Sequence, residues 1–164
     1  MNDIGILENK KILLVDDEPD VLETIKELLY MCVIDAAMSF ETAEILLNRN
    51  TYDVAVLDIM GVKGYDLLEI ANQKGIPALM LTANALSPDN FSRSIMAGAK
   101  AYIPKEKMSE IAVYLADFLR YQSGQQKHFH WFFQLRAFFE SQFGKDWIEK
   151  YEELKAKYGL SDDE

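Results

Sequence analysis

The fold of this chain follows from a short apolar run that ends in two acids, Lys11-Ile12-Leu13-Leu14-Val15-Asp16-Asp17. Four consecutive apolar residues between polar ones are typical of a strand that is buried on both faces of a sheet. Pro19 follows closely, and proline favours the first turn of a helix. We therefore expect a buried strand, a polar turn and a helix, which together begin a β–α unit.

The same pattern recurs four more times before residue 121. Each time, a short apolar run precedes a segment in which apolar residues recur at helical spacing. Strands that alternate with helices in this way indicate a parallel sheet that helices cover on both sides. The sequence therefore predicts an α/β fold, a doubly wound five-stranded parallel sheet. The four further strands are expected near residues 33–37, 53–57, 77–81 and 101–103.

The composition changes after residue 121. A polar break at 122–126 is followed by a segment rich in aromatic residues, since ten of the 19 aromatic residues lie within 122–164. We expect two parts, an α/β domain over residues 1–121 and a C-terminal helical extension over residues 122–164. Apolar residues recur at helical spacing on both sides of Gly144, which predicts a helical hairpin.

The first helix of this hairpin has two apolar stripes. One side can pack on the chain's own α/β domain. The other side then needs a further partner, because monomers rarely expose large apolar patches. That partner is the second hairpin helix, another subunit or an effector, so we expect residues 126–158 to offer a surface for a homodimer or an effector. The stripes consist of Phe129, Phe132, Phe133, Phe139 and Phe143, and of Trp131, Leu135 and Phe138.

Charge and cysteine usage argue against several functions. The net charge is −10 and neither part of the chain is basic, whereas a nucleic-acid binder needs a cationic patch. No apolar run reaches the roughly 20 residues of a membrane span, and the N-terminus lacks the pattern of a signal peptide. Cys32 is the only cysteine and is expected as a buried core thiol in a reducing compartment. We expect a cytoplasmic protein that contacts neither nucleic acid nor membrane.

Polar side chains collect where four of the predicted strands end. Asp16 and Asp17 follow the first strand, and Asp58 follows the third. Thr82 ends the fourth strand, and Lys105 comes shortly after the fifth. The carboxyl ends of parallel strands meet at one edge of the sheet, so we expect these side chains to converge. Three carboxylates need a cation to remain ionised together, and Mg²⁺ is a hard ion that prefers oxygen ligands.

This set of groups predicts phosphoryl-transfer chemistry. An aspartate carboxylate can attack a phosphoryl group and form an aspartyl phosphate. Mg²⁺ and the lysine ammonium would offset the charge of the transition state, and the threonine hydroxyl would donate to an anionic oxygen. Each residue alone is common in loops and caps, so the prediction rests on their joint position at the strand ends.

Four motifs at these strand ends resemble those of the receiver domain of bacterial two-component response regulators. They are Val15-Asp16-Asp17-Glu18, Leu57-Asp58-Ile59-Met60, Leu81-Thr82-Ala83 and Gly98-Ala99-Lys100-Ala101-Tyr102-Ile103-Pro104-Lys105. The resemblance covers about residues 9–121. It implies a flavodoxin-like sheet with the strand order 2-1-3-4-5. It also implies a signalling switch rather than an enzyme. The 43 residues after this segment are few for a winged helix, are not basic and are rich in Phe and Trp, so we expect output through protein–protein contacts without a DNA-binding output domain.

The resemblance implies a role for each acidic residue. Asp58 would accept a phosphoryl group from a histidine of a sensor kinase or a phosphotransfer protein. Asp16, Asp17 and Asp58 would hold Mg²⁺ together with the main-chain carbonyl of Met60. The Met60 side chain is apolar where a polar group could orient an attacking water. Because Met60 and Asn84 are expected to flank the route of that water, we expect slow dephosphorylation.

The remaining site residues follow from the same resemblance. Thr82 would be the switch hydroxyl that bonds the phosphate, Lys105 would pair with the phosphate, and Tyr102 would be the aromatic residue that turns inward on activation. Two features depart from the family pattern. The loop over residues 58–64 has no proline and is about two residues shorter, and Lys105 is followed by Glu106 where a proline with a cis bond is usual.

Two other functions stay open on the sequence alone. One is a Mg²⁺-dependent phosphohydrolase on the same fold, and the other is a receiver-like scaffold that no longer switches. A hydrolase would turn over a small phosphate ester, whereas a switch forms one stoichiometric acyl phosphate. No second acid stands two residues after Asp58, where phosphatases of the haloacid type carry their general acid. His128 and His130 would face apart on a helix and are a poor metal pair.

Overall fold

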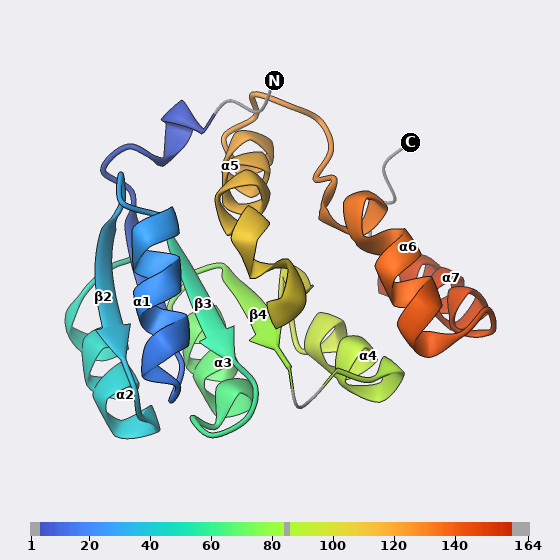
Figure 1. The fold of residues 1–164 in the computed structure, drawn as a ribbon, viewed down its shortest axis with the longest axis horizontal. Helices are drawn as coiled ribbons and strands as arrows, with labels where there is room; N and C mark the ends of the chain where they lie inside the picture. The colour runs from blue at the N-terminus through green and yellow to red at the C-terminus, as the bar shows by residue number, and fades with distance from the viewer. Residues whose placement is uncertain (1–3, 84–85, 159–164) are drawn as a thin grey trace.

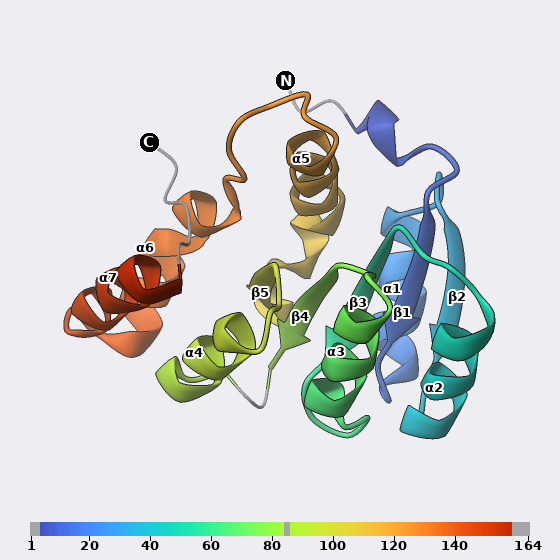
Figure 2. The same ribbon diagram turned by 180° about the vertical axis from the view of Figure 1, so that it is seen from behind.

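Five parallel strands form one sheet in the order β2-β1-β3-β4-β5, as the ribbon views show (Figures 1 and 2). The computed structural model describes residues 4–83 and 86–158. The doubly wound, flavodoxin-like sheet expected from the sequence is thereby confirmed. The strands are β1 (Lys11–Val15), β2 (Val33–Ala37), β3 (Val54–Asp58), β4 (Ala78–Thr82) and β5 (Ala101–Pro104).

Helices cover both faces of this sheet. α1 and α5 lie on one face, and α2, α3 and α4 lie on the other (Figures 1 and 2). Each helix follows a strand of the sheet, so the alternation expected from the sequence is confirmed. The helices are α1 (Pro19–Leu28), α2 (Phe40–Arg49), α3 (Gly64–Gln73), α4 (Pro88–Met96) and α5 (Ile111–Gln122), with short 3₁₀ turns η1 (Gly5–Leu7) and η2 (Lys105–Glu110).

Local sequence signals account for where these elements begin. The Ser39 hydroxyl accepts a hydrogen bond from the Thr42 amide at the start of α2, and Ser87 serves α4 in the same way. Every residue of β3 and β4 is buried, as expected for central strands. β2 is the exception, because it lies at the edge of the sheet and leaves the Val33 side chain half exposed.

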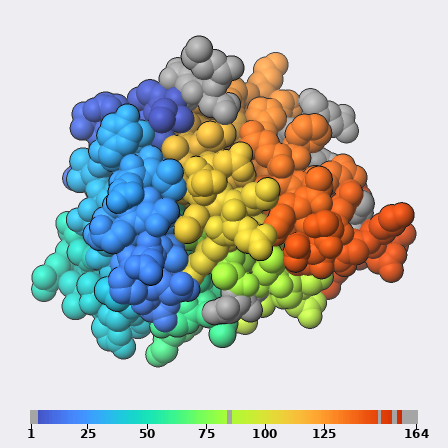
Figure 3. All heavy atoms as spheres, in the orientation of Figure 1, coloured from blue at the N-terminus to red at the C-terminus, as the bar shows by residue number. Residues whose placement is uncertain are grey.

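The residues after α5 form a helical hairpin, as predicted. α6 (Trp131–Phe143) ends at Gly144, whose φ of 86° lies in the left-handed region that favours glycine, and α7 (Trp147–Tyr158) returns alongside. α6 packs on α5 and α7 packs on α4. In the space-filling view the side chains of the hairpin meet those of α5 and α4 along a continuous surface (Figure 3).

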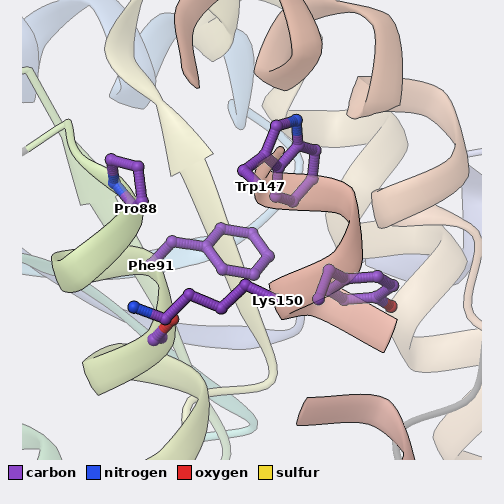
Figure 4. Close-up of a pocket in the computed structure, with 6 residues that line it drawn as sticks. Pro88, Phe91, Trp147 and Lys150 are labelled. Carbon is purple, nitrogen blue, oxygen red and sulfur yellow. The ribbon is translucent and has the colours of Figure 1, made fainter. Parts of the chain in front are cut away.

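One aromatic side chain of the α/β domain stands at the centre of this contact. Phe91 of α4 is 1% exposed, and its ring lies 5.2 Å from that of Phe139 and 5.6 Å from that of Trp147, centroid to centroid. The close-up shows Phe91 and Trp147 facing one another beside a shallow pocket between α4 and α7 (Figure 4). At its rim, Lys150 forms an exposed ion pair with Asp89. The hairpin therefore extends the hydrophobic core of the sheet domain.

The structure corrects the assignment of the aromatic stripes. The two predicted stripes of α6 merge into one buried face, and Phe133, which was expected in a stripe, is 60% exposed on the opposite side. Phe129 precedes α6 and packs on Phe118 of α5 instead. The buried face of α6 packs on α5 and on α7, so the second hairpin helix is one partner that covers it, as one of the expected alternatives had it. The buried face consists of Trp131, Phe132, Leu135 and Phe139.

The buried side chain of Asp117 holds the linker between α5 and α6 through hydrogen bonds. The Asp117 carboxylate, 4% exposed as a residue, accepts a hydrogen bond of 2.6 Å from the backbone amide of His130 and lies 3.0 Å from its Nδ1. Gln126 donates to the Asp117 carbonyl at 3.0 Å. His128 and His130 precede α6 and therefore flank the helix, and the His130 ring pairs with the Asp117 carboxylate.

The surroundings of the single cysteine differ from those expected. Cys32 is partly rather than fully buried, because it follows α1 at the end of the sheet, and burial still raises the pKa of its thiol to about 11. Among the described helices, none combines the length and apolar character that crossing a membrane requires.

We predict that Phe139→Ala lowers the free energy of unfolding of the hairpin by roughly 3–5 kcal/mol, because it removes a ring that is fully buried between α4 and α7. Phe133→Ala removes the same side chain from the exposed side of α6 and should change the value by less than about 0.5 kcal/mol. Urea denaturation followed by the fluorescence of Trp131 and Trp147 measures both. Equal effects of the two variants would contradict the assigned buried face.

Candidate functional site

The carboxyl ends of the strands bring together the polar residues expected there. Asp16 follows β1, Asp58 ends β3 and Thr82 ends β4, and these three residues are 0%, 4% and 1% exposed. β3 pairs with both β1 and β4, so the three strand ends are neighbours along one edge of the sheet. Asp17 comes one residue later and is exposed at the rim. The structure therefore contains a buried acidic site with an open side.

Lys105 reaches this site from the far end of the sheet. It opens η2 directly after β5, and its Nζ lies 2.8 Å from Asp16 Oδ2 and 3.5 Å from Asp58 Oδ2. No peptide bond within residues 4–83 and 86–158 is cis, including that between Lys105 and Glu106. The absence of a proline after Lys105 therefore leaves the ammonium within contact distance of both carboxylates.

The acids and the lysine shift one another's proton affinity. Burial, reinforced by the nearby charge of Asp16, raises the pKa of Asp58 to about 7, although Lys105 opposes the shift. Burial also raises the pKa of Asp16 against the hydrogen bond from Lys105. Burial alone would lower the pKa of Lys105, but its bonds to Asp16 and Glu18 raise it. The site therefore holds more negative charge than one lysine can neutralise.

This donor set fits a divalent cation with oxygen ligands. Ligand atoms of Asp16, Asp17 and Glu18 lie within 4.8 Å of one another. Asp16 Oδ2 is buried and faces the Lys105 ammonium at 2.8 Å, and a carboxylate oxygen has a second lone pair that a cation can use. A hard cation that retains several waters, such as Mg²⁺, takes ligands of this kind.

The backbone of the loop between β3 and α3 comes close to neighbouring groups at two glycines. Gly61 adopts a φ of 87°, and a Cβ at this position would collide with the carboxylate of Asp17. A Cβ on Gly64 would collide with the main-chain carbonyl of Asp58. Lys63 adopts the left-handed conformation that starts α3. The loop therefore folds tightly against the acids, while the Met60 side chain is 53% exposed at the rim.

The threonine and the tyrosine of the predicted site form one connected pair. Tyr102 of β5 is fully buried, and its hydroxyl accepts a hydrogen bond of 3.2 Å from the Ser87 amide. Thr82 also hydrogen-bonds to this hydroxyl. Burial raises the pKa of Tyr102 to about 12, so the phenol is protonated at neutral pH. Asn84, expected beside the route of an attacking water, lies outside the described residues.

Sequence reasoning missed two residues that matter for this site. Glu18 lies 3.0 Å from Lys105 Nζ through its Oε1 and holds the ammonium from the exposed side. Its position two residues after Asp16 in an acidic run was the available signal. Phe91 contacts the Tyr102 ring at 5.3 Å, centroid to centroid, and had no signal beyond one apolar position on a helix.

Comparison with known proteins agrees with this geometry. The family model of the response regulator receiver domain matches residues 12–115. The chain therefore belongs to the receiver-domain family of two-component response regulators. Receiver domains are signalling domains that bind Mg²⁺ at an acidic pocket and interact with histidine kinases or phosphotransfer proteins.

Curated relatives share the same segment. The chain is 35% identical over 106 residues to the transcriptional regulatory protein YvrH of Bacillus subtilis, covering 60% of this chain and 44% of that protein. It is 34% identical over 120 residues to the regulatory protein VanRB of Enterococcus faecalis, covering 70% of this chain and 54% of that protein. The chain thus spans about half the length of these relatives or less.

Solved structures show the same fold. A CheY-like receiver domain protein from Methanospirillum hungatei has 25% sequence identity and a TM-score of 0.65, covering 73% of this chain and 100% of that one. The receiver domain of the Francisella response regulator 1452 has 27% identity and a TM-score of 0.62, covering 70% and 99%. The similarity accounts for the sheet domain.

We predict that Asp58→Asn stabilises the metal-free chain at pH 8. The folded chain binds the Asp58 proton with a pKa of about 7 and the unfolded chain near 3.8, so stability falls as the pH rises from about 4 through 7. The variant escapes this loss and should gain roughly 2–4 kcal/mol at pH 8, and half of that or less at pH 5.

Urea denaturation in the presence of a chelator at both pH values measures this difference. Asp66→Asn is the matched control, because Asp66 is an exposed carboxylate at the start of α3. A gain at pH 8 that is equal to that at pH 5, or one that Asp66→Asn reproduces, would show that Asp58 carries no unfavourable buried charge.

Proposed function

We propose that this chain is a phosphorylation switch in which Asp58 accepts a phosphoryl group, in the presence of Mg²⁺, from a histidine of a sensor kinase or phosphotransfer protein. The observation that supports this most directly is the ammonium of Lys105, 3.5 Å from the Asp58 carboxylate and 2.8 Å from that of Asp16. Such a group neutralises phosphoryl oxygens as they approach two buried acids.

The proposed transfer uses side chains that lie close together at the strand ends. A carboxylate oxygen of Asp58 forms a bond to phosphorus while the bond from phosphorus to the histidine nitrogen breaks, and the histidine leaves. Lys105 exchanges part of its contact with Glu18 for a phosphoryl oxygen, and the Thr82 hydroxyl donates to another. Asp16, Asp17, Asp58 and the main-chain carbonyl of Met60 would hold Mg²⁺, which would supply further charge neutralisation.

The output of the switch is proposed to be contact with protein rather than with DNA. Residues 1–121 would act as the phosphoacceptor domain, and residues 122–164 as the extension that transmits its state to a second copy of the chain or to an effector. The net charge of −10 supports this choice, because phosphate backbones repel such a surface. We place this activity in the cytoplasm, where sensor kinases present their phosphohistidines.

We predict that Asp58→Asn abolishes phosphorylation. Incubation with acetyl phosphate and Mg²⁺ should give one adduct of about 80 Da on the unaltered chain, the mass of one HPO₃ unit on one carboxylate. Intact mass spectrometry measures it, and Asp66→Asn should be labelled like the unaltered chain. Labelling of the Asp58 variant would refute the assigned acceptor. Continuous release of phosphate without an adduct would instead identify a phosphohydrolase, and neither adduct nor release would identify a scaffold that no longer switches.

We predict that Met60→Asn shortens the lifetime of the phosphorylated chain by roughly tenfold, because an amide at the rim of the site can orient a water for attack on phosphorus. Met96→Asn is the matched control, since Met60 and Met96 are 53% and 50% exposed and Met96 belongs to α4. The loss of the mass adduct with time gives the half-life. An unchanged half-life in Met60→Asn would exclude this residue from control of hydrolysis.

A further inference from the structure

An unbroken series of contacts joins the phosphorylation site to the C-terminal hairpin. Thr82 stands at the strand edge beside Asp58 and hydrogen-bonds to the Tyr102 hydroxyl. The Tyr102 ring, fully buried, lies 5.3 Å from the ring of Phe91 and 6.1 Å from that of Phe139, centroid to centroid. Phe139 belongs to α6 of the hairpin. One side chain of β5 therefore touches both the switch hydroxyl and the extension.

We propose that docking of the hairpin (residues 131–158) on α4 and α5 and phosphorylation of Asp58 favour one another, because both require Tyr102 in its buried position. This inference rests on the proposed function and adds to it the element that the switch controls. The hairpin thus occupies the surface of α4 and α5 within the same chain, and phosphorylation stabilises this docked position.

The hydrogen bonds around Tyr102 give the sign of this coupling. The Ser87 amide donates to the Tyr102 oxygen, and the hydrogen bond between the Tyr102 and Thr82 hydroxyls can run in either direction, since each hydroxyl both donates and accepts. A phosphoryl group on Asp58 offers a charged acceptor for the Thr82 proton. All donors then point the same way, from Ser87 through Tyr102 and Thr82 to the phosphoryl oxygen. Bonds in such a chain strengthen one another, which holds the Tyr102 hydroxyl inward.

Packing on the hairpin side of Tyr102 also favours positive coupling between docking and phosphorylation. Phe91 and Phe139 pack on the Tyr102 ring and on one another, and Phe139 also packs on Trp147 at 5.7 Å, centroid to centroid. Moving the ring outward would break these contacts, and undocking the hairpin would uncover the ring. A ring that is held inward keeps the Thr82 hydroxyl paired and in place. Thermodynamic linkage makes this coupling reciprocal. If docking of the hairpin raises the affinity of the site for a phosphoryl group by some factor, phosphorylation favours docking by the same factor.

Hydrogen exchange of the full chain tests the first half of this reciprocity. Beryllium fluoride with Mg²⁺ serves as the phosphoryl mimic, and Mg²⁺ alone as the reference. We expect backbone amides over 131–158 to exchange roughly fivefold more slowly, or slower still, with the mimic bound. Faster or unchanged exchange there, in a sample that forms the acyl phosphate adduct, would overturn the coupling and leave the proposed function intact. Absence of the adduct would refute the proposed function instead.

Tyr102→Phe separates the coupling from the packing. The variant keeps the ring against Phe91 and Phe139 but lacks the hydroxyl between Ser87 and Thr82. We expect its hairpin amides to be as protected as those of the unaltered chain without the mimic, and to gain no further protection with it. A gain equal to that of the unaltered chain would show that the hydroxyl carries no coupling.

Phe139→Ala tests the second half. We expect it to weaken beryllium fluoride binding by roughly fivefold or more, although Phe139 touches no atom of the phosphorylation site. Phe133→Ala, on the exposed side of the same helix, should bind like the unaltered chain. Phe139→Leu keeps most of the apolar volume. It replaces the alanine variant in this test if Phe139→Ala unfolds the sheet domain, which faster exchange of the sheet amides would reveal. Unaltered affinity in both Phe139 variants would overturn the proposal.

Discussion

The structure depends on one electrostatic constraint, the burial of two carboxylates beside a single ammonium. Asp16 and Asp58 lie at the ends of adjacent strands, where the fold removes them from water and where their charges oppose one another. Lys105 offsets part of this charge, and Glu18 holds its ammonium from the solvent side. One ammonium does not neutralise these carboxylates, which favours a further cation at this edge of the sheet.

The loop after β3 is shaped by its closeness to these carboxylates. The loop after β3 comes so close to the acids that a Cβ on Gly61 would meet the Asp17 carboxylate, and one on Gly64 the main chain of Asp58. A loop with larger residues at these positions could not close over the acids at this length. The departures from the usual receiver pattern in this loop and after Lys105 therefore leave the assembled site intact, since Lys105 still contacts both carboxylates.

The C-terminal extension is a different kind of addition. The receiver-domain match ends at residue 115, and the hairpin beyond it is held by aromatic contacts around Phe91 and by the bonds of Asp117 to the linker. Because Tyr102 belongs to the sheet and also touches Phe139, the boundary between domain and extension passes through the core rather than along a surface. Packed side chains therefore connect the strand edge to the hairpin.

Local patterns in the sequence were sufficient to predict the strands, their parallel arrangement, the residues at their ends and the turn at Gly144. Apolar runs, helical spacing and glycine preferences act over a few residues, and motifs at strand ends inherit their place from the sheet. The strand order and the roles expected at the site came from the resemblance to receivers.

Which groups meet one another depends instead on the tertiary structure. Lys105 pairs with Glu18, which lies 87 positions earlier in the chain. The acidic run around Glu18 does not indicate which of its side chains contacts the lysine. The spacing of aromatic residues placed Phe133 in a buried stripe, yet the surface that α6 meets, formed by α5, α7 and Phe91, buries Trp131 and Phe132 and leaves Phe133 in water. Periodicity defines the faces of a helix, whereas the shape and chemistry of the neighbouring elements select the face that is buried.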